Sequence, residues 1–213
     1  MSTFRPLSIA LLSALAFVPS AFAQDVDTGY TNSPSGKRIA IVGGGAIMEP
    51  DSDPQPGSRI DVDGAAAPTL SASWYVNDNV ALELWGAADQ FNHRVRGDQG
   101  KIGTVEQQPV ALSGQYRFGT ADSLFRPFLG LGYYESNFSN EDISGDGLHV
   151  GLETARGPIA TAGLDLNISD RWFARTDLRY MQADADVNLA GQDTGQTFAL
   201  DPWTLGFGVG ARF

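Results

Sequence analysis

The chain has 213 residues, which is enough for one domain or at most two small ones. It carries 14 Lys and Arg against 25 Asp and Glu, a formal net charge of −11, and it has no Cys, so nucleic-acid binding, disulfide scaffolds and cysteine-ligated metal sites are disfavoured. With 25 Gly, 10% aromatic and only 18% charged residues, it fits neither an acidic disordered chain nor a helical bundle, because Gly opposes helix and aromatic residues favour strands. The composition favours an all-β protein.

The amino terminus has the pattern of a secretory signal peptide. An apolar run from Leu7 to Val18 is followed by Ala21-Phe22-Ala23, which supplies the small residues of a cleavage site. The run is too short to span a bilayer as a helix. We therefore expect a signal peptide at residues 1–23, a flexible periplasmic leader at residues 24–36, and the folded domain at residues 37–213.

Eight later segments alternate apolar and polar residues with a period of two, which is typical of strands with one apolar face. The clearest is Trp203–Phe213, where every odd position is apolar and every even position is small or polar. Each segment has about 10 residues, the length that a tilted strand needs to cross the hydrocarbon layer. The predicted strands lie near residues 37–48, 69–76, 80–89, 110–118, 125–134, 160–166, 171–180 and 203–213.

The connections between these segments alternate in length. Those at residues 77–78, 119–123 and 167–170 are short, whereas those near 49–66, 91–104, 138–155 and 184–199 are several times longer. Short turns on one side and long loops on the other are typical of outer-membrane barrels, whose short turns face the periplasm. The pattern predicts an eight-stranded antiparallel transmembrane up-and-down β-barrel. A secreted soluble barrel or sandwich with its apolar faces turned inward is the alternative.

Aromatic residues gather near the ends of the predicted strands on the apolar face. A transmembrane barrel places such rings at the two membrane interfaces. The predicted membrane aromatic belt consists of Trp74, Tyr116, Phe118, Tyr133, Trp172, Tyr180, Trp203 and Phe213.

The opposite faces of the strands point into a narrow interior, because eight strands enclose a space that side chains nearly fill. This disfavours a wide aqueous pore for sugars or ions. Bulky apolar groups beside glycines predict either a narrow apolar cavity or a solid lumen in which each ring packs over a neighbouring glycine. The predicted apolar lumen lining consists of Val42, Met48, Trp85, Phe128, Tyr134, Ile159 and Phe173.

Charged residues occupy the same inward faces. Because buried charges need partners, we expect an ion-pair floor toward the periplasmic half of the lumen. The predicted lumen charged cluster consists of Arg38, Glu83, Arg117, Arg126, Asp165, Arg171, Arg175, Asp177 and Arg179.

Signals for catalysis, metals and cofactors are weak. The two histidines, His93 and His149, fall in predicted loops, and the sequence contains no G-x-S-x-G elbow. The acidic stretches at residues 61–64 and 145–147 match only fragments of a calcium loop. We therefore expect no catalytic residue, no metal site and no cofactor.

Three stretches of the carboxyl half resemble the outer membrane protein W (OmpW) family. They are Leu200–Trp203 with the terminal Gly-Ala-Arg-Phe, the run from Phe125 to Tyr134, and Asp177–Met181. The likeness covers most of residues 67–213, and the terminal Phe213 resembles the signal that outer-membrane assembly machinery reads. The chain departs from the family in its first predicted strand, which contains no aromatic residue and carries three consecutive glycines.

The resemblance implies a barrel in the outer membrane of a Gram-negative bacterium, surrounded by outer-membrane lipids and lipopolysaccharide. The negative net charge predicts no nucleic-acid partner. The resemblance also implies an apolar lumen that passes small hydrophobic solutes, so the first functional hypothesis is a narrow hydrophobic channel for their passive passage. The alternative is a structural or interaction barrel whose extracellular loops act as a receptor or adhesion surface.

Overall fold

The computed structural model describes residues 35–49, 61–97, 100–139, 150–152, 154–182, 184–189, 192–199 and 201–213. The predicted signal peptide and almost all of the predicted leader lie outside the described residues, so both stay predictions. No helix among the described residues is long and apolar enough to cross a membrane.

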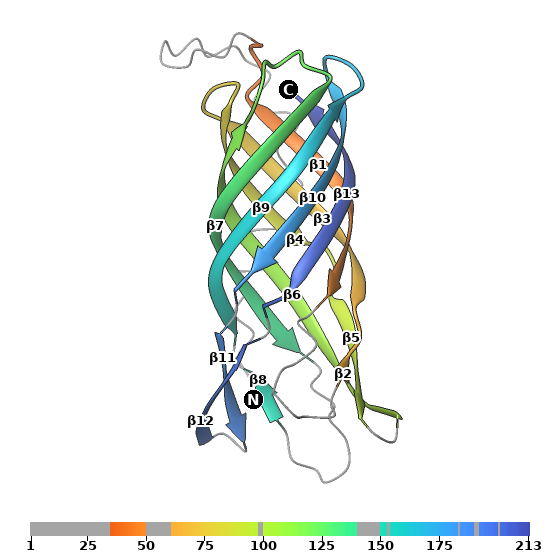
Figure 1. Ribbon diagram of the computed structural model, residues 1–213, viewed down its shortest axis with the longest axis vertical. Helices are drawn as coiled ribbons and strands as arrows, with labels where there is room; N and C mark the ends of the chain where they lie inside the picture. Colours follow the sequence, from red (N-terminus) through yellow and green to blue (C-terminus); the bar gives the residue numbers. More distant parts are fainter. Residues whose placement is uncertain are drawn as a thin grey trace.

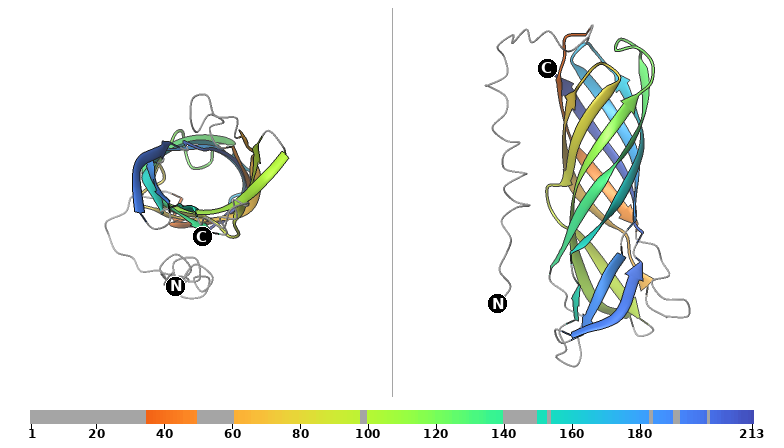
Figure 2. Two further views of the ribbon diagram at one scale, coloured as in Figure 1. Left: turned by 90° about the horizontal axis from the view of Figure 1, so that it is seen from below. Right: turned by 90° about the vertical axis from the view of Figure 1, so that its left-hand side faces the viewer.

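Eight strands close into an antiparallel barrel (Figures 1 and 2). Each pairs with the next barrel strand along the chain, and the first pairs with the last from Ala40 opposite Arg212 to Glu49 opposite Trp203. This last pairing leaves the barrel with no free edge, which confirms the predicted fold. The barrel strands are β1 (Ile39–Glu49), β3 (Ala65–Tyr75), β4 (Val80–Ala87), β6 (Gly100–Arg117), β7 (Phe125–Ser139), β9 (Ala155–Asn167), β10 (Trp172–Met181) and β13 (Trp203–Arg212).

The barrel has a short-turn end and a long-loop end. The connections at residues 76–79, 118–124 and 168–171 lie at the short-turn end, at the top of Figure 1 together with the carboxyl terminus. There the backbone N–H of Arg38 donates a hydrogen bond of 2.7 Å to the carbonyl of Phe213. An even number of barrel strands places the beginning of the first and the end of the last on the same side, as the sequence predicts.

The long-loop end contains more regular structure than the sequence predicts. Strand β6 begins at Gly100 instead of near residue 110, and β5 pairs along its extension. The predicted loops near residues 91–104 and 184–199 are therefore wrong as loops. Their polar composition hides the strands. Strand β5 forms because the edge of the extended β6 offers unpaired N–H and C=O groups, whereas the strands in the second range pair with each other. The accessory strands are β2 (Asp61–Val62), β5 (Phe91–Gly97), β8 (Val150–Leu152), β11 (Asp184–Leu189) and β12 (Gln192–Ala199).

The apolar faces of the barrel strands point outward. Leu131 is 75% exposed, Phe207 is 58% exposed and Leu112 is 57% exposed, whereas the residues on either side of Phe207 are glycines. An apolar band of this kind around a closed barrel requires a hydrocarbon environment. The alternative of a soluble barrel with inward apolar faces is therefore wrong.

The eight residues of the predicted aromatic belt lie on the outer face in two groups. Tyr180 is half-buried because its ring packs against Trp203, with the ring centroids 4.8 Å apart; the other seven are between 43% and 59% exposed. The 10 residues of β13, at about 3.3 Å per residue and a tilt of about 40°, span about 25 Å between the groups, the height of a hydrocarbon layer. Trp74, Tyr116, Phe118, Trp172 and Phe213 lie toward the short-turn end, and Tyr133, Tyr180 and Trp203 toward the long-loop end.

The seam between β1 and β13 contains glycines on both strands. Gly44 faces Gly208 across the seam, and a Cβ atom on Gly44 would overlap the backbone carbonyl of Phe207. We expect Gly44→Ala to lower the free energy of unfolding by about 1–3 kcal/mol, because overpacking would push the closing strands apart. The measurement is urea unfolding of the protein refolded into lipid vesicles.

The neighbouring glycine provides a matched control. A Cβ atom on Gly43 would meet nothing within 4 Å, so Gly43→Ala is expected to change stability by no more than about 0.5 kcal/mol. Equal effects of the two substitutions would show that the seam is not tightly packed at Gly44.

Candidate functional site in the barrel lumen

The inward face of β10 displays the order of the lumen from one end to the other. Because alternate strand residues point inward, this face carries, from the short-turn end, Phe173, Arg175, Asp177, Arg179 and Met181, all of which are buried. An aromatic ring thus comes first, three charges follow, and an apolar side chain ends the series.

Arg175 is the centre of a buried ion-pair network. It donates two hydrogen bonds to Asp165, from Nε to Oδ1 at 2.7 Å and from Nη2 to Oδ2 at 3.0 Å, and one from Nη1 to Oε2 of Glu83 at 2.6 Å. Arg179 donates to the other oxygen of Glu83 at 3.0 Å and, through Nε, to Asp177 at 2.8 Å. All five residues are at most 8% exposed. Charges buried this deeply are stable only when they are paired. The network therefore holds the charged side chains of the lumen in one arrangement.

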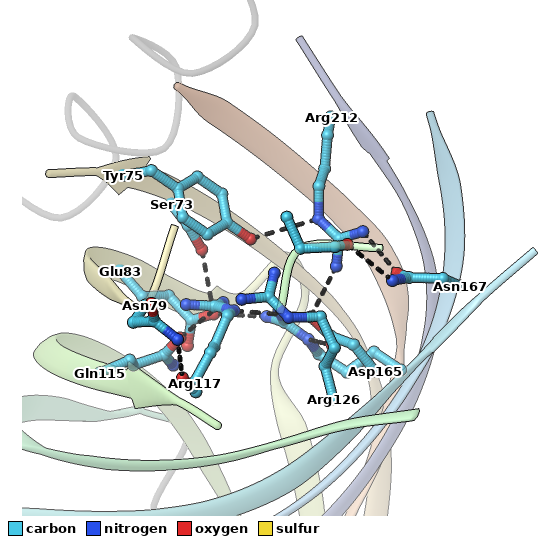
Figure 3. A network of polar contacts seen from close by, with 12 residues as sticks. Ser73, Tyr75, Asn79, Glu83, Gln115, Arg117, Arg126, Asp165, Asn167 and Arg212 are labelled. Atoms are coloured by element: carbon cyan, nitrogen blue, oxygen red, sulfur yellow. Dashed lines mark hydrogen bonds and ion pairs between the residues drawn. The ribbon is translucent and has the colours of Figure 1, made fainter. Parts of the chain in front are cut away.

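Two more arginines converge on Asp165 from the short-turn side (Figure 3). Arg212 donates from Nη2 to Oδ2 of Asp165 at 3.0 Å and from Nη1 to the side-chain oxygen of Asn167 at 2.5 Å. Arg117 has its Nε 3.5 Å from the same Asp165 oxygen and donates from Nη2 to Gln115 at 2.9 Å. One carboxylate therefore faces three guanidinium groups.

Arg126 occupies a different position. It faces Asp165 across the β7–β9 pairing, yet its one hydrogen bond among the described residues runs from Nη2 to the backbone carbonyl of Asp78, at 2.6 Å. Because it is only 2% exposed, Arg126 is a buried cation held by a neutral group.

Aromatic rings separate the arginines. The ring centroid of Phe128 lies 4.7 Å from the guanidinium carbon of Arg175 and 5.3 Å from that of Arg117. Phe173 lies 4.0 Å from the corresponding carbon of Arg212. Such cation–π contacts stabilise charges that have left water.

The same two rings lie over glycines. A Cβ atom on Gly163 would overlap the ring of Phe128, and one on Gly210 would overlap the ring of Phe173. At these two positions the lumen is solid, as in the second of the two predicted arrangements.

The predicted apolar lining is divided between two clusters. Met48, Trp85, Tyr134 and Ile159 belong to what we name the long-loop cluster, whereas Val42 and Phe173 belong to the short-turn cluster, and Phe128 lies among the arginines. The long-loop cluster comprises Ala46, Met48, Ala65, Ala67, Trp85, Ala87, Phe91, Ala111, Tyr134, Ala155, Ile159 and Met181, and the short-turn cluster Ala40, Val42, Tyr75, Ala81 and Phe173.

Beside the network the described residues leave a space of about 10 Å³, lined by Trp85 and Arg179 and also by Val42 of the short-turn cluster. This is the size of roughly one water molecule. The ring of Trp85 covers Arg179, whose guanidinium carbon lies 4.5 Å from the ring centroid. The axis of the barrel is therefore closed at the network.

Two residues of the predicted lumen charged cluster, Arg171 and Arg38, lie at the edge of the lumen. The prediction omits one lumen arginine, Arg212. Arg171 is exposed and stacks on Phe213, with its guanidinium carbon 4.4 Å from the ring centroid, so its assignment to the network is wrong; it precedes β10 in a turn, where strand parity no longer holds. Arg38 is half-buried just before β1. Arg212 was missed, although it shares the even positions of the inward glycines of β13.

His93 belongs to β5 and not to a loop. Its ring is 2% exposed and stacks on Phe91, with the centroids 6.4 Å apart, and its Nδ1 lies 3.0 Å from the carbonyl of Asp63. Burial lowers the pKa of His93, and this effect outweighs the opposing contributions of the Asp63 carbonyl and of Glu49. The ring is therefore neutral at pH 7. His149 lies outside the described residues.

This geometry defines a class of protein: a small transmembrane β-barrel of the bacterial outer-membrane type, with a lumen closed by ion pairs. The family model of the OmpW family matches residues 39–213. Outer membrane protein W of Escherichia coli K12 is 32% identical over 152 residues, covering 68% of this chain and 71% of the relative. Outer membrane protein W of Salmonella typhimurium LT2 is 28% identical over 222 residues and covers both chains fully.

Solved structures agree with this assignment. The crystal structure of OprG from Pseudomonas aeruginosa matches with a TM-score of 0.69 at 26% identity, over 83% of this chain and 96% of that one. The solution structure of E. coli outer membrane protein W matches with a TM-score of 0.59 at 26% identity, over 83% and 98%. The chain belongs to the OmpW family and is a protein of the Gram-negative outer membrane. In barrels of this kind the short turns face the periplasm.

Proposed function

We propose that this barrel passes small apolar molecules from the cell surface into the hydrocarbon of the outer membrane. The observation that carries the proposal is the order of groups along the lumen: the long-loop cluster faces the outside, and the ion-pair network lies beneath it.

The two halves of the lumen differ in how easily their side chains rearrange around a solute. The long-loop cluster contains Met48 and Met181, whose unbranched side chains repack at low cost. The side chains of the network below it cannot rearrange in the same way, because separating Glu83 from Arg175 or Arg179 leaves a buried charge without its partner.

An apolar solute is therefore accepted in the outer half and rejected at the network. Ions and sugars are rejected in the outer half, where their hydration has no substitute. Since the axis is closed below, the solute leaves sideways into lipid. The solute thus enters the membrane rather than the periplasm.

The test measures entry of the hydrophobic dye N-phenylnaphthylamine into lipid vesicles that contain the full mature protein. We expect faster entry than into empty vesicles and a several-fold further increase in Met181→Ala, which removes a fully buried side chain from the long-loop cluster. Leu178→Ala is the matched control, because Leu178 lies on the outer face of the same strand and is 42% exposed.

Equal rates for empty and protein-containing vesicles would overturn the proposal and favour the interaction barrel instead. Equal acceleration by Met181→Ala and Leu178→Ala would indicate leakage around the barrel rather than through its lumen. The predicted role of Phe213 in recognition by the assembly machinery is a separate proposal; the side chain is 48% exposed at the short-turn end.

A further inference from the structure

A vestibule opens at the short-turn end of the barrel. Its volume is about 1100 Å³, and its lining includes Arg126, Arg212 and Tyr75 from the lumen together with residues of the short turns. The function proposed above does not use it, because the ion-pair network separates it from the long-loop cluster.

The buried charges of the lumen, of which Arg126 and Arg212 line this vestibule, do not balance among the described residues. Five buried arginines point into the lumen against three buried carboxylates, an excess of two positive charges among the described residues. Each carboxylate already accepts from at least one arginine. The arginines are Arg117, Arg126, Arg175, Arg179 and Arg212, and the carboxylates are Glu83, Asp165 and Asp177.

Arg126 is the buried arginine at the vestibule that has no ion pair among the described residues, and its Nε is a buried N–H group without a hydrogen-bond partner there. Nη1 of Arg117 also has no hydrogen-bond partner among the described residues, although Nε of Arg117 lies 3.5 Å from Asp165. Arg117 is 0% and Arg126 is 2% exposed. A buried donor of a charged group that makes no hydrogen bond is costly, so these atoms indicate a missing acceptor.

The acids near the vestibule do not fill this role. Asp122 and Asp170 are exposed at the rim, and Asp78 is half-buried. The carboxylate of Asp78 accepts from the hydroxyl of Ser35 at 2.5 Å, and its contact with Arg126 is through the backbone carbonyl.

We propose that the floor of the vestibule binds a phosphate-type oxyanion at Arg126 and Arg212, which both line it. The planar guanidinium fork matches two oxygens of such an anion, and two charges remain to be neutralised. The ring of Tyr75 lies beside the site, 4.8 Å from the guanidinium carbon of Arg117, and its hydroxyl meets Nε of Arg212 at 3.4 Å. The phosphate enters from the periplasm, either free or as a lipid head group.

The test is calorimetric titration of inorganic phosphate into the full mature protein in a non-ionic detergent at constant ionic strength. We expect saturable binding that Arg126→Gln weakens at least about tenfold, because each charged hydrogen bond of a bidentate pair is strong. Arg171→Gln is the matched control: Arg171 lies at the same end but is exposed and stacked on Phe213, so its removal leaves the affinity unchanged.

Absence of saturable binding to the wild-type protein, or equal weakening by the two glutamine variants, would overturn the proposal. Folding of each variant is checked by the different gel migration of unboiled and boiled samples. If Arg126→Gln does not fold, Arg126→Lys decides the matter, since lysine keeps the charge but loses the fork: weaker binding supports the site and unchanged binding overturns it.

A final arm identifies the source of the oxyanion. Phosphatidylglycerol is added to the detergent micelles before the phosphate titration. Displacement of phosphate by the lipid assigns the site to a head group, and an unchanged phosphate isotherm assigns it to a soluble anion.

Discussion

Replacing Glu83 by Gln is expected to lower the free energy of unfolding of the barrel by about 3–5 kcal/mol, the cost of removing one partner of a buried ion pair. The side chain of Glu83 is 0% exposed, and its two oxygens accept from different arginines, Arg175 at 2.6 Å and Arg179 at 3.0 Å. Glutamine preserves the shape but removes the charge, so a lumen that already has an excess of positive charge acquires one more.

The measurement is urea unfolding in lipid vesicles, and the chain offers a matched control. Glu135 forms an ion pair of 3.2 Å with Arg156 on the outer face, where the two side chains are 47% and 49% exposed. Glu135→Gln is expected to cost less than about 1 kcal/mol, because an exposed pair is weakened by solvent. A small effect of Glu83→Gln, similar to that of the control, would mean that water enters the network and that it does not close the lumen.

Replacing Leu129 by Arg is expected to lower the free energy of unfolding by about 2–4 kcal/mol, the cost of a lipid-facing cation near the bilayer midplane. Leu129 is 54% exposed on the outer face of β7. Along this strand it lies between Phe125, near the short-turn end, and Tyr133, at the opposite interface, so a cation at this position has no short route to water.

Leu124→Arg is the control for position. Leu124 is 57% exposed, as much as Leu129, but it belongs to the turn that precedes β7, and an arginine there is expected to cost about 0–1 kcal/mol. Urea unfolding in lipid vesicles distinguishes the two variants. If Leu129→Arg were as mild as Leu124→Arg, this part of β7 would face water or another protein instead of lipid.

The phosphate site and the apolar route are independent of each other. The first depends on Arg126 and Arg212 at the short-turn end, and the second depends on the long-loop cluster, with the Glu83 network between them. If the protein does not accelerate dye entry, the phosphate titration still tests the phosphate site. If phosphate does not bind, dye entry still tests the apolar route.

Much of the fold can be predicted from local pattern. A strand turns successive side chains to opposite faces whatever its neighbours are, so the parity of β10 places Arg175 inward and Leu178 outward before any pairing is known. The short turn between Tyr75 and Val80 likewise follows from polar residues between two alternating segments.

Other features could not be predicted because they depend on neighbouring strands. The extension of β6 to Gly100 exists where β5 pairs with it, and the residues of both are too polar to indicate a strand. The exclusion of Arg171 from the network depends on where β10 begins, which a period-two pattern does not fix to one residue.

The sequence by itself determined the number of barrel strands, the face of each that meets lipid and the presence of charges in the lumen, because alternation and turn length are properties of short segments. Only the tertiary structure decided which charges meet. Glu83 and Arg175 lie 92 positions apart in the chain, and they come together because closure of β1 against β13 sets how the walls of the cylinder face one another. The same closure turns five arginines and three carboxylates into the lumen, where Nε of Arg126 has no hydrogen-bond partner among the described residues.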